Sequence, residues 1–164
     1  AAQNGHLAVV AKLIATGALL DKALTGDDDT PLWIVAHSGH VTIGPTPLYV
    51  AAFFGHLPVV DELITAGALV DEAVTCGWSP LFIAAHQGNL PVVTRLVAAG
   101  AHVDKAATDD GATPLFIAAQ RGHAAVVATL LQHGADKLIH CVANQTALEA
   151  AQLNGHAAVV ALLA

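Results

Sequence analysis

A glycine recurs along this chain at a nearly constant interval. The first two members are 34 residues apart, and from the third onward the successive intervals are 33, 34 and 33 residues. The glycines are Gly5, Gly39, Gly55, Gly88, Gly122 and Gly155. A period of roughly 20 to 50 residues is typical of proteins built from stacked units, each of which buries its apolar face only against its copies. The recurrence therefore predicts a linear stack of similar units rather than a globule around one centre.

One unit, Thr113 to Asp136, shows the internal pattern most fully. Thr113 is a favourable N-cap, and Pro114 suits the first helical position, where no amide donor is needed. Apolar residues at helical spacing follow as far as Gly122, and a second such set ends at Gly134. Because glycine readily ends a helix in the left-handed conformation, the unit is predicted to be two short helices joined by a turn.

The opening of this unit, Thr-Pro-Leu or a close variant, recurs along the chain. The copies begin at Thr30, Thr46, Ser79, Thr113 and Thr146. In these features the chain resembles the ankyrin repeat, whose period is about 33 residues and whose signature is T-P-L-H-x-A. The resemblance covers essentially all of residues 1–164. It implies an all-α solenoid of stacked helix-turn-helix units with short β-turn fingers, forming a single array.

The array is irregular at its ends and at one internal junction. Both ends of the sequence fall inside partial repeats, so we expect a fragment of a longer array. Thr46 follows Thr30 by only 16 residues, so about 17 residues of a repeat are expected to be missing at residues 43–44. A Cα distance between Ile43 and Gly44 clearly above the roughly 3.8 Å of a trans peptide would support this. The alternative is a genuine splice that joins two first helices directly.

The charge and the cysteines bear on partners and location. The chain has 13 acidic and six basic residues, a net charge of −7, which makes nucleic acid and anionic membranes poor partners. No apolar run reaches the 18 or so residues of a membrane-spanning helix, so no membrane insertion is expected. Cys76 and Cys141 fall at comparable finger positions two repeats apart, so stacked repeats would hold them beyond the roughly 7 Å limit between Cα atoms for a disulfide. Two unpaired thiols favour a cytoplasmic, intracellular setting.

The residues that could carry chemistry have simpler explanations. His37 and His40 flank Gly39, which ends the helix between them, so they do not share a helical face as zinc ligands would. Neither a nucleophile elbow nor a glycine-rich phosphate loop is present, and neither cysteine has an activating base beside it. We expect no catalytic residue, no metal and no cofactor, and therefore no enzyme.

The resemblance places the candidate binding residues on the fingers and on the inner helices, which line a concave groove in ankyrin arrays. Phe53 and Phe54 cannot both face one core, since neighbours on a helix point about 100° apart, so at least one should reach the groove. The alternative is that they pack beneath a neighbouring finger. The residues expected to contact a partner are Phe53, Phe54, Trp78, His86, Gln87, Asp109, Asp110 and Arg121.

One position departs systematically from the ankyrin signature. The residue after Thr-Pro-Leu is usually histidine in the family, and here it is aromatic in four units. We expect a stacked apolar ladder that packs between repeats, because aromatic stripes are more often core than ligand sites. The four residues are Trp33, Tyr49, Phe82 and Phe116.

The expected function is a non-catalytic scaffold that binds a protein partner in the concave groove. Acidic fingertips at Asp27–Asp29, Asp109 and Asp110 favour a partner with basic residues. Two alternatives stay open: a regulatory or targeting arm of a larger enzyme or channel, and a structural subunit of a large assembly. The second is favoured by the many alanines at outward positions of the second helices.

Overall fold

The computed structural model describes residue 11 and residues 45–164. Within residues 45–164 it contains eight helices and no strand, which confirms the expected all-α fold. The helices are α2 (Pro47–Phe54), α3 (Leu57–Thr65), α4 (Pro80–Gln87), α5 (Leu90–Ala98), α6 (Pro114–Arg121), α7 (Ala124–Gln132), α8 (Ala147–Leu153) and α9 (Ala157–Leu163). The junction at Ile43–Gly44, the acidic run Asp27–Asp29, Trp33 and the pair His37 and His40 lie outside the described residues.

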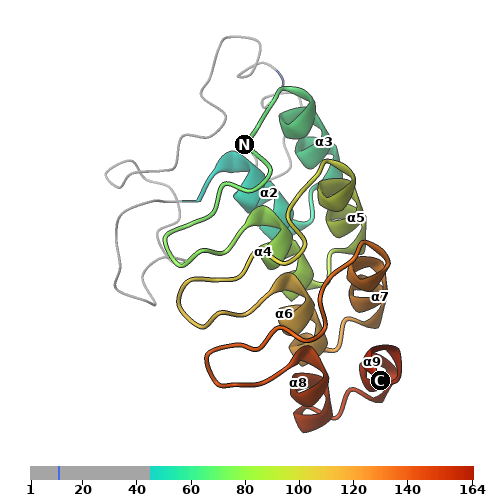
Figure 1. Cartoon of the computed structure of the whole chain (residues 1–164). Coiled ribbons are helices and arrows are strands. Elements are labelled where there is room, and N and C mark those ends of the chain that lie inside the picture. The colour runs from blue at the N-terminus through green and yellow to red at the C-terminus, as the bar shows by residue number, and fades with distance from the viewer. Residues whose placement is uncertain (1–10, 12–44) are drawn as a thin grey trace.

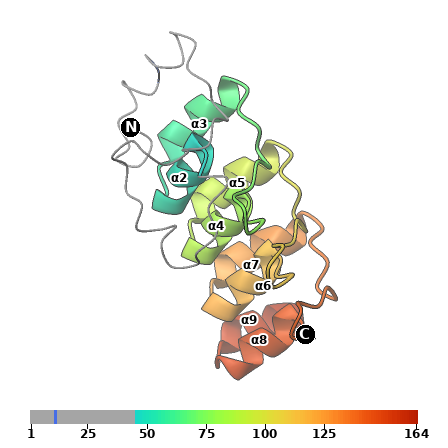
Figure 2. The same cartoon turned by 90° about the vertical axis from the view of Figure 1, so that its left-hand side faces the viewer.

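The helices pair into four hairpin units that stack in a row (Figure 1). The first helices of the units, α2, α4, α6 and α8, contact one another in order and form an inner column. The second helices, α3, α5, α7 and α9, form an outer column in the same order. The loops between units project to one side, away from the outer column (Figure 1), and Figure 2 shows the same succession of units from the side.

Local signals in the sequence determine where each inner helix begins and ends. Its first turn is capped by a hydroxyl that accepts a hydrogen bond from the backbone N–H three residues on, at 3.1 to 3.3 Å. These caps are Thr46, Ser79, Thr113 and Thr146. Three of the four helices end at a glycine in the left-handed conformation, Gly55, Gly88 and Gly122. The expected caps from Thr46 onward and these three glycine stops are confirmed, whereas α8 has its C-cap at Asn154, one residue before Gly155, and the cap expected at Thr30 lies outside the described residues.

In each of the last three units a polar side chain lies against the glycine of the unit before it. His156 donates from Nε2 to the carbonyl of Gln120 at 3.0 Å, and its ring covers Gly122. A Cβ added to Gly122 would lie only 2.6 Å from Nδ1 of that ring. Glycine is therefore required here for the close approach as well as for the positive φ. The equivalent pairs are Asn89 with Gly55 and His123 with Gly88.

The fingers are joined to one another by backbone hydrogen bonds. The N–H of Thr108 donates to the carbonyl of Cys76 at 2.8 Å, and that of Val142 donates to the carbonyl of Asp110 at 2.7 Å. Asn144 in the last finger has a φ of 58°, the left-handed conformation that asparagine adopts more readily than most non-glycine residues. The units are thus connected at the fingers as well as through their helices.

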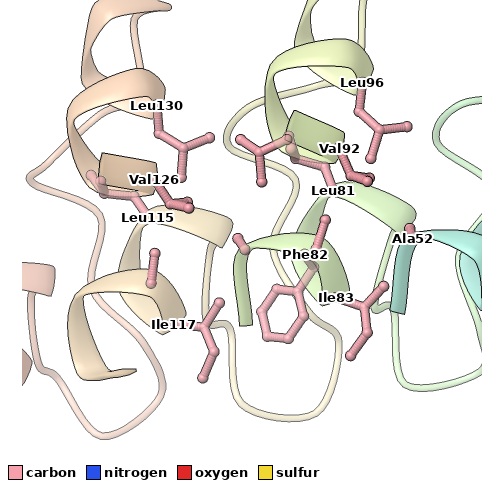
Figure 3. Packing of buried hydrophobic residues seen from close by; sticks show 14 of the residues in the cluster. Ala52, Leu81, Phe82, Ile83, Val92, Leu96, Leu115, Ile117, Val126 and Leu130 are labelled. Carbon is pink, nitrogen blue, oxygen red and sulfur yellow. The ribbon is translucent and has the colours of Figure 1, made fainter. Parts of the chain in front are cut away.

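The core fills the space within and between units (Figure 3). Alanines at the centre of the inner helices, such as Ala84 and Ala118, are fully buried and allow neighbouring helices to approach closely. Tyr49, Phe82 and Phe116 are at most 6% exposed, which confirms the expected packing stripe. Their rings do not stack on one another in residues 45–164, so the expected stacking was wrong. The one stacking contact that any of the three makes there joins Phe82 to Trp78.

Candidate functional site

Six of the eight predicted site residues fall into three groups along the inner helices and fingers. Two groups lie where the inner helices end, at Phe53 with Phe54 on α2 and at His86 on α4 with Arg121 on α6. The third is the fingertip pair Asp109 and Asp110. Because α2, α4 and α6 pack side by side, the last turns of these helices form one row along the stack.

Phe53 and Phe54 form an aromatic pair at the end of α2. Their rings meet edge to face, with centroids 4.9 Å apart and planes at 74°. The ring of Phe54 also stacks on His56, with centroids 6.0 Å apart. Both phenylalanines are half-buried, and Phe53 packs against the core. Each ring therefore keeps some accessible surface, and whether that surface meets a partner remains a prediction.

Trp78, which directly precedes the N-cap of α4, stacks on two side chains of that helix. These are Phe82 and His86, which lie four residues apart and therefore on the same face of α4. The indole of Trp78 stacks on the buried ring of Phe82, with centroids 5.1 Å apart, and on the imidazole of His86, with centroids 6.2 Å apart. Sequence reasoning singled out Trp78 and His86 separately but missed this stack. The four-residue spacing on α4 could have placed His86 beside Phe82, but Trp78 precedes the helix, so that spacing does not predict its position.

His86 forms the contact between neighbouring inner helices at this row. Arg121 of α6 donates from Nη2 to Nε2 of His86 at 2.8 Å. Because Nε2 accepts, the proton of the neutral ring is on Nδ1. Burial lowers the pKa of His86 below its ordinary value, and the positive charge of Arg121 and the neighbouring His123 lower it further. His86 is therefore neutral at pH 7 and serves as an acceptor for the guanidinium.

Two donors in this cluster have no acceptor among the described residues. Nδ1 of His86 and Nε1 of Trp78 are both buried and unpaired. A buried donor without a partner costs roughly 1 to 3 kcal/mol. The cluster formed by Trp78, His86 and Arg121 thus has more hydrogen-bond donors than acceptors.

The fingertip aspartates are exposed, but their carboxylates also shape the turn. Oδ1 of Asp109 accepts from the N–H of Asp110, and Oδ1 of Asp110 accepts from the N–H of Ala112, both at 2.9 Å. Burial raises the pKa of the Cys76 thiol, and the nearby charges of these two aspartates add to the rise. The thiol is therefore protonated at neutral pH, which is the unreactive form.

Other features of residues 45–164 concern metals, thiols and membranes. No group of three or more histidine, cysteine or acidic side chains there is arranged to hold a metal ion. Cys76 and Cys141 are free thiols. None of the helices in that range has the length and hydropathy needed to cross a bilayer.

Gln87, the remaining predicted site residue, is exposed at the end of α4 beside His86.

Comparison with known protein families gives one match. A family model described as ankyrin repeats (many copies) matches residues 48–97 and residues 81–131, which together span just over half of the chain. The two matches overlap in α4 and α5, and their combined range includes every predicted site residue. The comparison with curated proteins gives no match.

Proposed function

Because this chain belongs to the ankyrin-repeat family, whose members generally act as protein–protein interaction modules, we propose that it is a non-catalytic scaffold that binds one protein partner. The partner contacts the row of inner-helix ends and the finger bases, hereafter the inner face, defined by Phe53, Phe54, Trp78, His86 and Arg121. Members of the family are typically non-catalytic, and the proposed role needs no cofactor.

The observation that carries this proposal is the set of partly accessible aromatic side chains on the inner face. Phe53, Phe54 and Trp78 are half-buried and held by ring contacts, and Phe53 and Trp78 also pack against the core. All three keep some contact with solvent. Aromatic side chains with little freedom left to lose are the commonest energetic centres of protein interfaces. A partner that covers them gains apolar burial without having to order the rings.

Charge supports the choice of a protein partner and suggests its nature. The net charge of −7 opposes binding of nucleic acid. Exposed carboxylates at Asp109 and Asp110 attract a partner that carries basic residues near the fingers. A cytoplasmic location is part of the proposal, because free thiols persist in reducing compartments.

A second candidate function is that of a structural subunit in a larger assembly. It is favoured by small apolar residues on the outer column, where Ala125, Ala157 and Ala158 are exposed along with Leu162. A partner that packed against that column would leave the inner face free. The experiment below separates the two candidates by the face that each requires.

The test is to compare partner binding by the wild type and by a Phe53→Ala/Phe54→Ala double variant. Proteins captured by the wild type are identified by mass spectrometry, and the affinity of each purified protein is then measured by calorimetry. We expect the double variant to lose at least thirtyfold in affinity, about 2 kcal/mol, with a smaller loss of stability. Thr94→Ala on the outer helix α5, where the side chain is exposed, is the control and should bind normally.

A double variant that unfolds more easily but binds normally when folded would make both phenylalanines core residues and reject the proposal. A partner lost through Ala125→Asp or Ala158→Asp, but not through the phenylalanine changes, would favour the structural subunit.

A further inference from the structure

Most cations in residues 45–164 have an oxygen partner. Arg95 donates from Nε to Asp61 at 2.5 Å. Lys105 donates from Nζ to the carbonyl of Asp71 at 2.6 Å, and Lys137 donates to that of Leu163 at 3.0 Å. These side chains are held by negative or partly negative groups.

Arg121 differs from the other cations of that range. Its only hydrogen-bond partner there is the neutral ring of His86, which accepts one of the five guanidinium N–H groups. The side chain is exposed, and no carboxylate of the described residues pairs with it. Nδ1 of His86 and Nε1 of Trp78, in the same cluster, also lack an acceptor among the described residues. Within those residues, the cluster therefore contains no spare oxygen that could pair with the guanidinium. The guanidinium is therefore oriented, charged and available.

We propose that Arg121 binds the carboxylate of an aspartate or glutamate in the protein partner, and that His86 orients the guanidinium for this contact. The proposal rests on the proposed function, since it specifies chemistry at the inner face. A guanidinium presents a planar fork of donors that matches a carboxylate in two parallel hydrogen bonds. One bond to His86 limits rotation of the guanidinium and leaves other N–H groups for the ligand.

A carboxylate fits this site better than a phosphate does. Arginine binds both anions, but the chain carries a net charge of −7, which penalises a doubly charged ligand more than a singly charged one. The site has one available cation among the described residues, rather than the arginine cluster that recognises phosphorylated segments. A single carboxylate matches that charge.

The two charged positions of the α6 unit also give the partner an orientation. Asp109 and Asp110 precede α6, whereas Arg121 ends it, and the eight-residue helix between them is roughly 12 Å long. A segment lying across the unit would therefore place basic residues near the finger and an acidic residue near the helix end. The reversed segment would set like charges against each other at both positions.

The experiment begins by selecting peptides that bind the full chain from a random phage-displayed library. Each selected peptide is then synthesised in two forms, one with its acidic residue and one with that residue replaced by asparagine or glutamine. Binding is measured to the wild type, to Arg121→Gln and to the control Arg95→Gln on the outer column. We expect a fixed acidic position in the selected peptides, and a loss of at least tenfold on amide replacement with the wild type and with Arg95→Gln. With Arg121→Gln the same replacement should change binding less than twofold, because the pair is already broken.

Three outcomes would overturn the inference. The selected peptides could lack a common acidic residue, or amide replacement could weaken wild type and Arg121→Gln equally. A phosphoserine placed at the acidic position and binding tenfold more tightly than glutamate would assign the site to phosphate. The proposed function fails separately if peptide binding is unchanged by Phe53→Ala/Phe54→Ala and by Trp78→Ala. Matching circular dichroism melts for Arg121→Gln and the wild type show that the exposed substitution leaves the fold intact.

Discussion

At the scale of single residues, two glycines with the same backbone conformation have different neighbours. Gly122 and Gly134 have φ values of 80° and 85°, so alanine is strained at both. Only Gly122 has a ring against it, since nothing lies within 4 Å of a Cβ placed on Gly134. The difference between the two alanine variants therefore isolates the contact with His156.

We predict that Gly122→Ala destabilises the protein more than Gly134→Ala does. The strain of a left-handed alanine costs about 1 to 2 kcal/mol at either position. At Gly122 the displaced ring also loses its hydrogen bond to Gln120, which adds about 1 kcal/mol or more. Urea unfolding of both variants measures the difference. Equal losses would show that the His156 ring moves aside without cost.

His86 gives the chain a predictable dependence on pH. Its pKa is lowered first by burial and then by Arg121 and His123, so the folded protein disfavours the protonated ring. Stability from this group is fully present above the unfolded pKa of about 6.5 and is lost as the pH falls from that value through the lower pKa of the folded protein. We predict that the wild type loses more stability between pH 7.5 and 5.5 than His86→Gln does.

The extra loss of stability in the wild type, relative to His86→Gln, should stay below about 1 kcal/mol. The imidazole is partly exposed, so solvent screens its repulsion by Arg121. Denaturant unfolding across that pH range checks the prediction. Parallel curves for the two proteins would show that other histidines account for the whole pH dependence.

At the scale of elements, the sequence predicts the helix ends well and the contacts between helices poorly. A cap such as Thr113 with Phe116 depends on residues three apart, so Thr-Pro-Leu followed by glycine specifies it locally. The hydrogen bond between His86 and Arg121 joins residues 35 apart. It depends on the offset between stacked helices, which the repeat period does not give. The burial of the rings that follow Thr-Pro-Leu could be predicted from the sequence. The side chains that contact those rings could not, because they too depend on the offset between stacked helices.

The finger that carries Asp109 and Asp110 is the element expected to control association. Replacing both residues by asparagine removes two charges and keeps side-chain oxygens that can accept from the N–H groups of Asp110 and Ala112. We predict a slower association rate with the partner and a weaker dependence of that rate on salt, with little change in dissociation. Stopped-flow or surface-binding kinetics at two ionic strengths measure both. An association rate that does not respond to salt in the wild type would remove the electrostatic part of the proposal.

At the scale of the whole molecule, the helices of each unit contact mainly those of its neighbours, so position in the stack should decide how far a defect spreads. Leu115 of α6 and Leu163 of α9 are both buried, at 0% and 2% exposure. Replacing either by alanine creates a cavity that costs about 2 to 5 kcal/mol. We predict that Leu163→Ala removes amide protection from α8 and α9 alone, whereas Leu115→Ala lowers it throughout residues 45–164.

Hydrogen exchange resolved by peptide gives the comparison. Loss of protection in α4 caused by Leu163→Ala would mean that the units unfold as one body, contrary to the nearest-neighbour expectation.

The side chains that lie against the preceding glycines have a mechanical consequence. Each one joins only two adjacent units, so these contacts lie in series, and a force that draws the two ends of the stack apart acts in full on every one of them. The weakest contact yields first, and its unit extends while the others stay folded. A released unit of about 33 residues lengthens to roughly 110 Å. Under tension the array would therefore unfold one unit at a time, and each step would occur at a similar force.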